Sequence, residues 1–375
     1  MLRFTLLLFV LFWTAAPASA AHWEVAQAAR LGEWLDGAPN EALPSMAQQA
    51  EAVRAAVAAG DPVALDDVAT RAALTLARAL RMGVVPEGAR GGWEISGDGL
   101  YTDFQGALTA ALADGTLDQY FAGMRPSHPF YGLLQQGFVA STDPARKTLI
   151  AANMERWRWM PHAMGERYLF VNAATFEVTL WEKGAPVRRW PVIVGKKSTP
   201  TPVFAARITG VVLNPWWEIP ASIVAESVGS MMRKRPAEAR RKGYVIEGGR
   251  YRQRPGPANS LGQMKLVMPN PHTVYLHDTP SKQLFDRDVR AFSHGCIRVG
   301  GALDLATTLL SAQSDWPTTR IEEQLASGKT SIAQLSREVP VYITYFTAEP
   351  DGAGGIRALP DIYQNDYELI RYMQQ

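Results

Sequence analysis

The chain has 375 residues, 47% hydrophobic and 20% charged, which is typical of a soluble globular protein with room for two domains. Its formal net charge of +2 gives no reason to expect a nucleic-acid-binding protein. It contains one cysteine, which excludes an intramolecular disulfide framework. Its 6 histidines show no metal-ligand spacing, so neither a metal nor another cofactor is expected.

Residues 1–20 have the pattern of a secretory signal peptide. Arg3 supplies the positive charge, Leu6–Trp13 is a short apolar core, and Ala18-Ser19-Ala20 fits a cleavage site. The apolar run is shorter than the roughly 20 residues that span a bilayer, and no later run is long enough. An uncleaved membrane anchor is the alternative. We expect an exported chain with no integral membrane span that begins near Ala21.

Residues 21–160 are predicted to form a mainly helical scaffold domain. Glu51–Ala59 and Val68–Met82 carry apolar residues at helical spacing, and Asp66 is a possible N-cap of the second helix. Gly91-Gly92 indicates a loop between helices. Asn153–Trp159 is expected to end a helix that leads into the next domain.

Residues 161–350 are predicted to form a β-rich domain. Phe176–Glu182 alternates apolar and polar residues, as a half-buried strand does. Many short strands separated by Gly and Pro favour a sandwich or barrel over a doubly wound sheet, so the expected fold class is α+β. Residues 351–375 are expected to pack on the scaffold as an extension. The other strand candidates are Tyr168–Asn172, Val187–Val194, Arg207–Leu213, Gly262–Val267, Thr273–Leu276 and Val339–Thr347.

One segment, about residues 220–260, interrupts the β pattern. Pro220–Lys242 has a helical pattern, and Gly248-Gly249 and Pro255-Gly256-Pro257 follow as loop. Such an excursion beside a site could act as a lid. The alternative is a solvated helical insertion, and the pattern does not separate the two.

The single cysteine, Cys296, is the first candidate for chemistry. A free thiol in an exported protein is open to oxidation, so it is either buried and inert or chemically used. Gly295 gives the backbone freedom for close approach of a substrate, and the N–H groups of Gly295 and Cys296 could donate to an oxyanion. Arg298 adds positive charge and a fork for a carboxylate. These neighbours predict a cysteine nucleophile.

A thiol nucleophile also needs a base. His277 follows a strand candidate, and His294 lies two residues before Cys296. Adjacent residues rarely place an imidazole correctly on a thiol, so His277 is the preferred base. The alternative for either histidine is a structural hydrogen bond. Asp278 could orient a neighbour or simply start a turn.

The run Ser293-His294-Gly295-Cys296-Ile297-Arg298, with His277 upstream, resembles the signature of L,D-transpeptidases with a YkuD-type catalytic domain. The similarity extends from about Asn153 to Asp366. Asn214–Pro220 and Tyr275–Pro280 resemble the large periplasmic members that have a capping subdomain. One departure is that no room remains between the helical region and the catalytic domain for the separate peptidoglycan-binding module that these members often carry.

This resemblance implies a fold and a site. The domain would be a mainly antiparallel β-sandwich with a helical capping insertion, and the cysteine and histidine would lie at one edge. His277 would be base and then acid, oriented by a backbone carbonyl as is usual in the family, and not by the Asp278 carboxylate. Trp216 would shape the substrate channel or be a core aromatic. The other expected oxyanion or substrate-binding residues are Gly295, Arg298, Ser293, His294 and Tyr275.

The resemblance also implies a reaction on peptidoglycan stem peptides in the periplasm, with roles in cell wall organisation and cell shape. Cys296 would form an acyl-enzyme, release the terminal D-amino acid, and pass the acyl group to a diaminopimelate side-chain amine, which makes 3-3 or 1-3 cross-links. Such enzymes are carbapenem targets.

Two other readings remain. One is a hydrolase (carboxypeptidase or amidase) on the same scaffold, which differs in whether the pocket excludes water. The other is a non-catalytic wall-binding protein, against which the intact cysteine, histidine and arginine argue. The insertion favours a transferase. Oligomeric state is not predicted.

Overall fold

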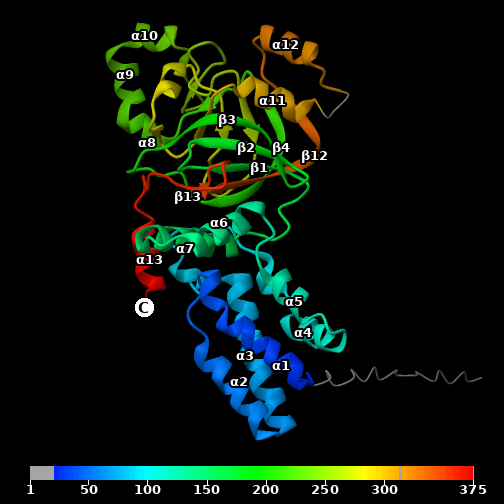
Figure 1. Cartoon of the computed structure of the whole chain (residues 1–375). Helices are drawn as coiled ribbons and strands as arrows, with labels where there is room; N and C mark the ends of the chain where they lie inside the picture. Colours follow the sequence, from blue (N-terminus) through cyan, green and yellow to red (C-terminus); the bar gives the residue numbers. More distant parts are fainter. Residues whose placement is uncertain (1–20, 312–314, 375) are drawn as a thin grey trace, which may run out of the picture. The chain divides into compact units, whose positions relative to one another are not determined.

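A computed structural model describes residues 21–311 and 315–374 (Figure 1). The expected signal peptide, residues 1–20, lies outside the described residues. The described chain divides into two compact units, residues 21–82 with 99–125 and residues 83–98 with 126–374. None of the helices in the described residues has the length and apolar character needed to cross a membrane.

The first unit is helical, as expected. The predicted helices at 51–59 and 68–82 lie within α2 and α3. Asp66 is not the N-cap of α3, because the helix begins one turn earlier at Pro62 and the Asp61 carboxylate accepts from the Val63 N–H at 3.0 Å. Asp66 instead accepts from the Trp23 N–H. The helices are α1 (Val25–Asp36), α2 (Ala47–Ala59), α3 (Pro62–Met82), α4 (Phe104–Ala113) and α5 (Leu117–Met124), with 3-10 turns at Ala38–Glu41 and Asp98–Tyr101.

The second unit is built on one mixed sheet. The strand order is β10-β3-β11-β9-β8-β4-β12-β1-β2, and β2 also pairs with β3, so the sheet closes on itself. The strands are β1 (Arg167–Asn172), β2 (Glu177–Glu182), β3 (Ala185–Gly195), β4 (Phe204–Leu213), β8 (Met264–Val267), β9 (Leu276–His277), β10 (Ala291–Ser293), β11 (Ile297–Val299) and β12 (Ser331–Thr344).

The expected α+β class is confirmed, and most strand pairs are antiparallel. The sheet closes through the long strand β3. Its first part forms a hairpin with β2 across the turn at Lys183-Gly184, and its last residues pair with β11 and β10. One strand therefore joins the two ends of the sheet.

Helices α6 (Pro129–Ala140) and α7 (Pro144–Arg158) belong to the second unit, so the domain boundary expected at residue 160 falls earlier. Trp157 in α7 stacks on Phe346 with ring centroids 4.5 Å apart, and Arg156 pairs with Asp366. The C-terminal extension packs on α7, which lies in this unit and not in the helical first unit. It contains β14 (Ile356–Ala358), which pairs with β13 (Ala348–Pro350), and α13 (Asp366–Met373). Figure 1 shows α13 beside α7.

The insertion between β4 and β8 is helical only in its first half. It contains α8 (Ala221–Ile223), a π-helical turn (Val224–Val228), α9 (Gly229–Lys234) and α10 (Pro236–Arg241). The rest is a small sheet, β5-β7-β6, of β5 (Trp217–Glu218), β6 (Tyr244–Glu247) and β7 (Arg250–Gln253). Gly248 and Gly249, with φ of 55° and 75°, form the tight turn of the β6–β7 hairpin. Gly248-Gly249 was expected as loop, and the two strands that flank it were not predicted.

Helices α11 (Ala302–Leu310) and α12 (Thr318–Ala326) complete the second unit and contact β8, β12 and β4. Two 3-10 turns lie at Glu87–Ala89 and Lys282–Asp286. In Figure 1, α11 lies over the side of the sheet away from α6 and α7.

Candidate active site

Cys296 lies in a turn, residues 293–296, that joins β10 to β11; we call it the nucleophile turn. Gly295 has a φ of +112°, a backbone conformation that residues with a side chain rarely adopt. The Ser293 hydroxyl donates to the Cys296 carbonyl at 2.5 Å and accepts from the Gly295 N–H at 3.1 Å. The turn is thus closed by its own serine.

Because of this closure, the two expected oxyanion donors, the N–H groups of Gly295 and Cys296, are not equally available. The Gly295 N–H is taken by the Ser293 hydroxyl. The Cys296 N–H has no hydrogen-bond acceptor within residues 21–311 and 315–374. Cys296 is therefore the better candidate donor, and Gly295 contributes backbone shape.

His277 is at the end of β9, between β8 and β11. Its cross-strand partners are Lys265 and Arg298. The side chain is buried, and its Nδ1 bonds the backbone carbonyl of Asp278. That bond places the proton on Nδ1 and leaves the Nε2 lone pair as an acceptor.

Asp278 supports this arrangement through its backbone rather than its carboxylate. The carboxylate accepts from the Gln263 N–H at 2.9 Å and pairs with Lys282. It lies so close to Gly262 that a Cβ at that position would approach it to 2.3 Å. The Asp278 carbonyl that accepts from His277 is therefore held in place by the turn in which the Asp278 carboxylate pairs with Lys282.

Burial keeps both reactive groups neutral. Burial lowers the pKa of His277 to about 4, and the nearby cations Arg298 and Lys265 act in the same direction. Burial also raises the pKa of the Cys296 thiol, against the opposing effects of a Tyr275 backbone hydrogen bond, Arg298 and Lys265. At neutral pH the pair is a thiol and a neutral imidazole, which suits removal of the thiol proton during attack.

Both groups line an open cleft with a volume of about 1110 Å³. Of the expected site residues, Tyr275, His277, Ser293, His294, Cys296 and Arg298 line it. Trp216 does not: the Arg252 guanidinium lies 4.3 Å from its ring, and the next residue, Trp217, faces the cleft instead. Neighbours on an extended chain point to opposite sides, which explains the exchange.

The insertion forms one wall of this cleft, through residues 217–228 and part of the β6–β7 hairpin. Glu226, in the π-helical turn, is hydrogen-bonded to His294 Nε2 at 2.7 Å. It also forms an ion pair with Lys196 at 3.6 Å. The contact with His294 holds the pKa of Glu226 below its usual range. The insertion therefore touches the nucleophile turn directly; we call it the cap.

Sequence reasoning missed several residues that line the cleft or contact its lining residues. Lys265 lies in a predicted strand, but its pairing with His277 depends on strand register. Glu226 had no signal beyond a helical pattern. Thr273 offers its carbonyl to the Cys296 thiol at 3.9 Å from a loop with no motif. Arg233 and Arg250 add positive charge from the cap.

Comparison with known proteins agrees with this geometry. Residues 166–341 match the L,D-transpeptidase catalytic domain named YkuD, and residues 9–137 match a scaffold domain. The chain thus contains a region similar to the YkuD L,D-transpeptidase catalytic domain, preceded by a region similar to the scaffold domain. The catalytic-domain match contains every candidate site residue, from Trp216 to Arg298.

The chain is also similar to individual proteins, at modest identity. A Haemophilus influenzae protein, whose own assignment as an L,D-transpeptidase is provisional, is 33% identical over 240 residues. The match covers 59% of this chain and 48% of that protein, so the chain spans about half of that relative's length.

Among solved structures, an L,D-transpeptidase from Mycobacterium smegmatis is 14% identical over 48% of this chain and 58% of that one, with a TM-score of 0.29. L,D-transpeptidase 3 from Mycobacterium tuberculosis, in complex with a faropenem-derived adduct, is 13% identical over 48% and 60%, with a TM-score of 0.26. Likenesses of this strength say nothing about ligand or activity.

Proposed function

We propose that this chain is an exported peptidoglycan L,D-transpeptidase with Cys296 as its nucleophile and His277 as its general base. The observation that carries the proposal is the pairing of parallel strands β9 and β11, which puts the two residues in one cleft with His277 Nε2 left as an acceptor. The signal-peptide pattern of residues 1–20 supports a periplasmic location.

In the first half-reaction, the Cys296 sulfur attacks the carbonyl of a donor stem peptide while His277 Nε2 takes the thiol proton. A bond between sulfur and carbonyl carbon forms, and the carbonyl oxygen becomes an oxyanion that accepts from the Cys296 N–H. His277 then gives its proton to the leaving nitrogen, the carbon–nitrogen bond breaks, and the terminal amino acid departs.

In the second half-reaction, a side-chain amine of a diaminopimelate on another stem attacks the thioester. His277 takes a proton from that amine, and the new amide forms as the sulfur leaves. The product is a 3-3 or a 1-3 cross-link. A transferase must favour the amine over water, and the cap wall along one side of the cleft supports this by enclosing the acyl group.

The charge of the cleft suits a stem peptide that carries free carboxylates. Arg233, Arg250 and Arg298 line it. Among the described residues that line the cleft, the one carboxylate, Glu218, is paired with Arg252. The balance of charge therefore favours an anionic ligand.

Incubation of the purified protein with muropeptides, followed by mass spectrometry, tests the proposal. Dimers with release of an amino acid, absent with Cys296→Ala, are expected, and fragmentation of the dimers reports the cross-link. Trimmed monomers alone would replace the transferase with a hydrolase. No turnover, together with sacculus binding by Cys296→Ala, would leave a wall-binding protein and contradict both enzymes.

A further inference from the structure

The nucleophile turn is held by a second loop, residues 195–201, which lies between β3 and β4. The Lys196 N–H and the Thr199 hydroxyl both donate to the Ser293 carbonyl, at 2.9 and 3.2 Å. The Thr201 hydroxyl donates to the Gly295 carbonyl at 2.9 Å. This loop thus fixes two of the turn's carbonyls; we call it the support loop.

The contact with the Gly295 carbonyl has a chemical consequence. The carbonyl of Gly295 and the N–H of Cys296 belong to one planar trans peptide group, so they point in opposite directions. When Thr201 fixes the carbonyl, it also fixes the direction of the N–H that the oxyanion would use. Thr201 is 3% exposed and its hydroxyl also accepts from the Gly195 N–H at 2.9 Å, so its hydrogen is directed at Gly295.

The support loop is in turn held by the C-terminal extension. The Tyr363 hydroxyl donates to the Gly195 carbonyl at 2.8 Å and accepts from the Thr201 N–H at 3.3 Å. The loop is tightly packed at Gly195, since a Cβ added there would lie only 2.2 Å from the Thr199 carbonyl oxygen. One phenol therefore bridges both ends of the support loop.

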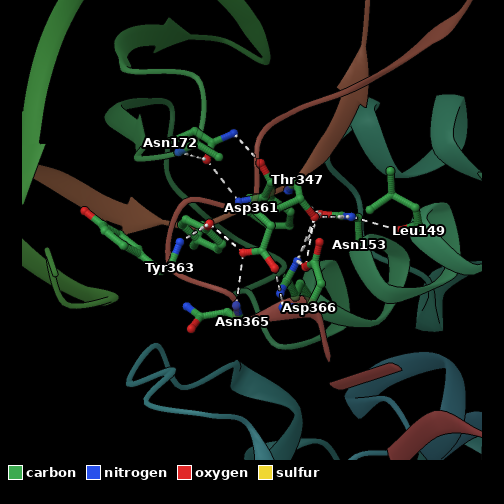
Figure 2. Close-up of polar contacts among 12 residues, drawn as sticks. Leu149, Asn153, Asn172, Thr347, Asp361, Tyr363, Asn365 and Asp366 are labelled. Carbon is green, nitrogen blue, oxygen red and sulfur yellow. Dashed lines mark hydrogen bonds and ion pairs between the residues drawn. The ribbon is translucent and has the colours of Figure 1, made fainter. Parts of the chain in front are cut away.

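Tyr363 is itself fixed at ring and backbone. Its ring stacks on Tyr345 at 5.1 Å, and its N–H donates to the Tyr345 hydroxyl at 3.0 Å, which donates to the Asp361 carboxylate at 2.7 Å. Asp361 also accepts from the Asn365 and Asp366 N–H groups, both at 3.0 Å, as Figure 2 shows for Asn365.

The segment is anchored to α7 by a buried ion pair. The Asp366 carboxylate lies 2.6 Å from the Arg156 guanidinium and accepts from the Thr347 hydroxyl at 3.0 Å (Figure 2). The Asn153 side chain bonds the same threonine, with its amide nitrogen 3.0 Å from the hydroxyl and its oxygen accepting from the Thr347 N–H at 2.8 Å. Each of these groups is buried, so Tyr363 is presented from a rigid base.

We propose that Tyr363 is a positioning residue: through Thr201 and the Gly295 carbonyl, the C-terminal extension aims the Cys296 N–H at the oxyanion. This rests on the proposed role of Cys296. It predicts a defect in attack on a carbonyl, where an oxyanion forms, and no defect in simple alkylation of the thiol, where none forms.

The test compares two reactions of the full-length protein. A carbapenem acylates Cys296: the sulfur–carbon bond forms, the lactam carbon–nitrogen bond breaks, and the thiol proton passes to the lactam nitrogen. Iodoacetamide alkylates the same sulfur with loss of iodide and release of the proton to solvent. Tyr363→Phe should slow acylation about tenfold, and Thr201→Val by up to about 100-fold, since loss of an oxyanion donor costs about 10²–10³. Alkylation should stay within about twofold.

Three further variants make the test specific. Thr201→Ser keeps the hydroxyl and should acylate at close to the wild-type rate. Tyr367→Phe, in α13 four residues after Tyr363 and 69% exposed, is the matched control and should change neither reaction. Tyr363→Phe combined with Thr201→Val should be little slower than Thr201→Val alone, because both act through one hydrogen bond to Gly295.

Equal rates of acylation in wild type and Tyr363→Phe would overturn the inference, as would a parallel loss of acylation and alkylation, which indicates general loosening. If Tyr363→Phe does not fold, the contrast between Thr201→Val and Thr201→Ser decides the same question. Failure of the wild type to form any adduct on Cys296 would instead count against the proposed function.

Discussion

His277 and Arg298 are direct partners across the parallel strands β9 and β11, and both face the cleft that contains Cys296. A permanent cation beside a buried imidazole disfavours its protonated form. Burial, with a further contribution from this cation, holds the pKa of His277 at about 4, against an ordinary value of 6.5.

The acid limb of acylation is the first consequence. A base works only when neutral, so the rate should fall as pH falls through about 4, rather than through the range of an exposed histidine. Arg298→Gln removes a cause of the low pKa, so its acid limb should move toward neutral pH. Carbapenem acylation rates between pH 3.5 and 9, over the range where circular dichroism is unchanged, measure this. If the acid limbs of wild type and Arg298→Gln coincide, Arg298 does not lower the pKa of His277.

Lys265→Met should move both the acid limb and the alkaline limb of the pH dependence of acylation to higher pH. Lys265 lies opposite His277, with its Nζ 4.8 Å from the Tyr275 ring centroid. Its charge lowers the pKa of both His277 and Cys296, so its removal should raise both. Lys197→Met is the control: Lys197 is exposed, bonds Gln364 and should leave both limbs in place.

Gly295→Ala should lower both activity and stability. Alanine is strained at a φ of +112°, at a cost of roughly 1–3 kcal/mol in the free energy of unfolding. Gly132→Ala is the matched control, because Gly132 lies in α6 with open space at the Cβ position, and alanine there should stabilise by up to about 1 kcal/mol. Urea unfolding measures both, and similar effects of the two changes would argue against strain in the nucleophile turn.

Glu226→Gln should weaken the contact between cap and nucleophile turn. Glu226 is exposed, so its pairs with His294 and Lys196 contribute little at high salt. We expect KM for a donor peptide to rise roughly two- to fivefold with little change in kcat, because the variant loses cap closure and keeps the reacting groups. The difference from wild type should shrink as NaCl increases. A large fall in kcat would assign Glu226 to the chemistry instead.

Acid should destabilise the second unit through His128. This side chain stacks on Trp157 at 4.2 Å, and burial lowers its pKa to about 3. Between its ordinary value of 6.5 and about 3 the unfolded chain binds the extra proton, so stability falls as pH falls through this window. His128→Phe should flatten the dependence. Denaturant titrations at pH 7 and pH 5, monitored by tryptophan fluorescence, give the free energy of unfolding of wild type and variant. An equal loss of stability between the two pH values in both proteins would contradict the role of His128.

The sequence predicted what local patterns encode. The long strands and helices α2 and α3 of the first unit were predicted because alternation or helical periodicity is visible within each segment. The strand candidate Thr273–Leu276 overlaps the two-residue strand β9 only at Leu276, because the position of β9 depends on partners in β8 and β11. The identities of Cys296 and His277 followed from residue type and resemblance.

The contacts that support the nucleophile turn could not be predicted from the sequence for the same reason. Thr201 lies 94 positions from Gly295, and Tyr363 lies 168 positions from Gly195. Neither hydroxyl belongs to a periodic pattern or a charge cluster. Their roles arise from where a closed sheet brings distant segments together, and that closure depends on the pairing of the end of β3 with β11 and β10, which local patterns do not report.

The cap joins two adjacent antiparallel strands, since Leu213 in β4 pairs with Met264 in β8, and the Asn214 N–H donates to the Gln263 carbonyl at 2.8 Å. Topologically, about fifty residues form one long hairpin loop whose ends already meet. The entropy of closing such a loop grows only with the logarithm of its length. The cap can therefore lengthen, shorten or change sequence at little cost to the sheet, which leaves ligand preference free to diverge while Cys296 and His277 stay in register.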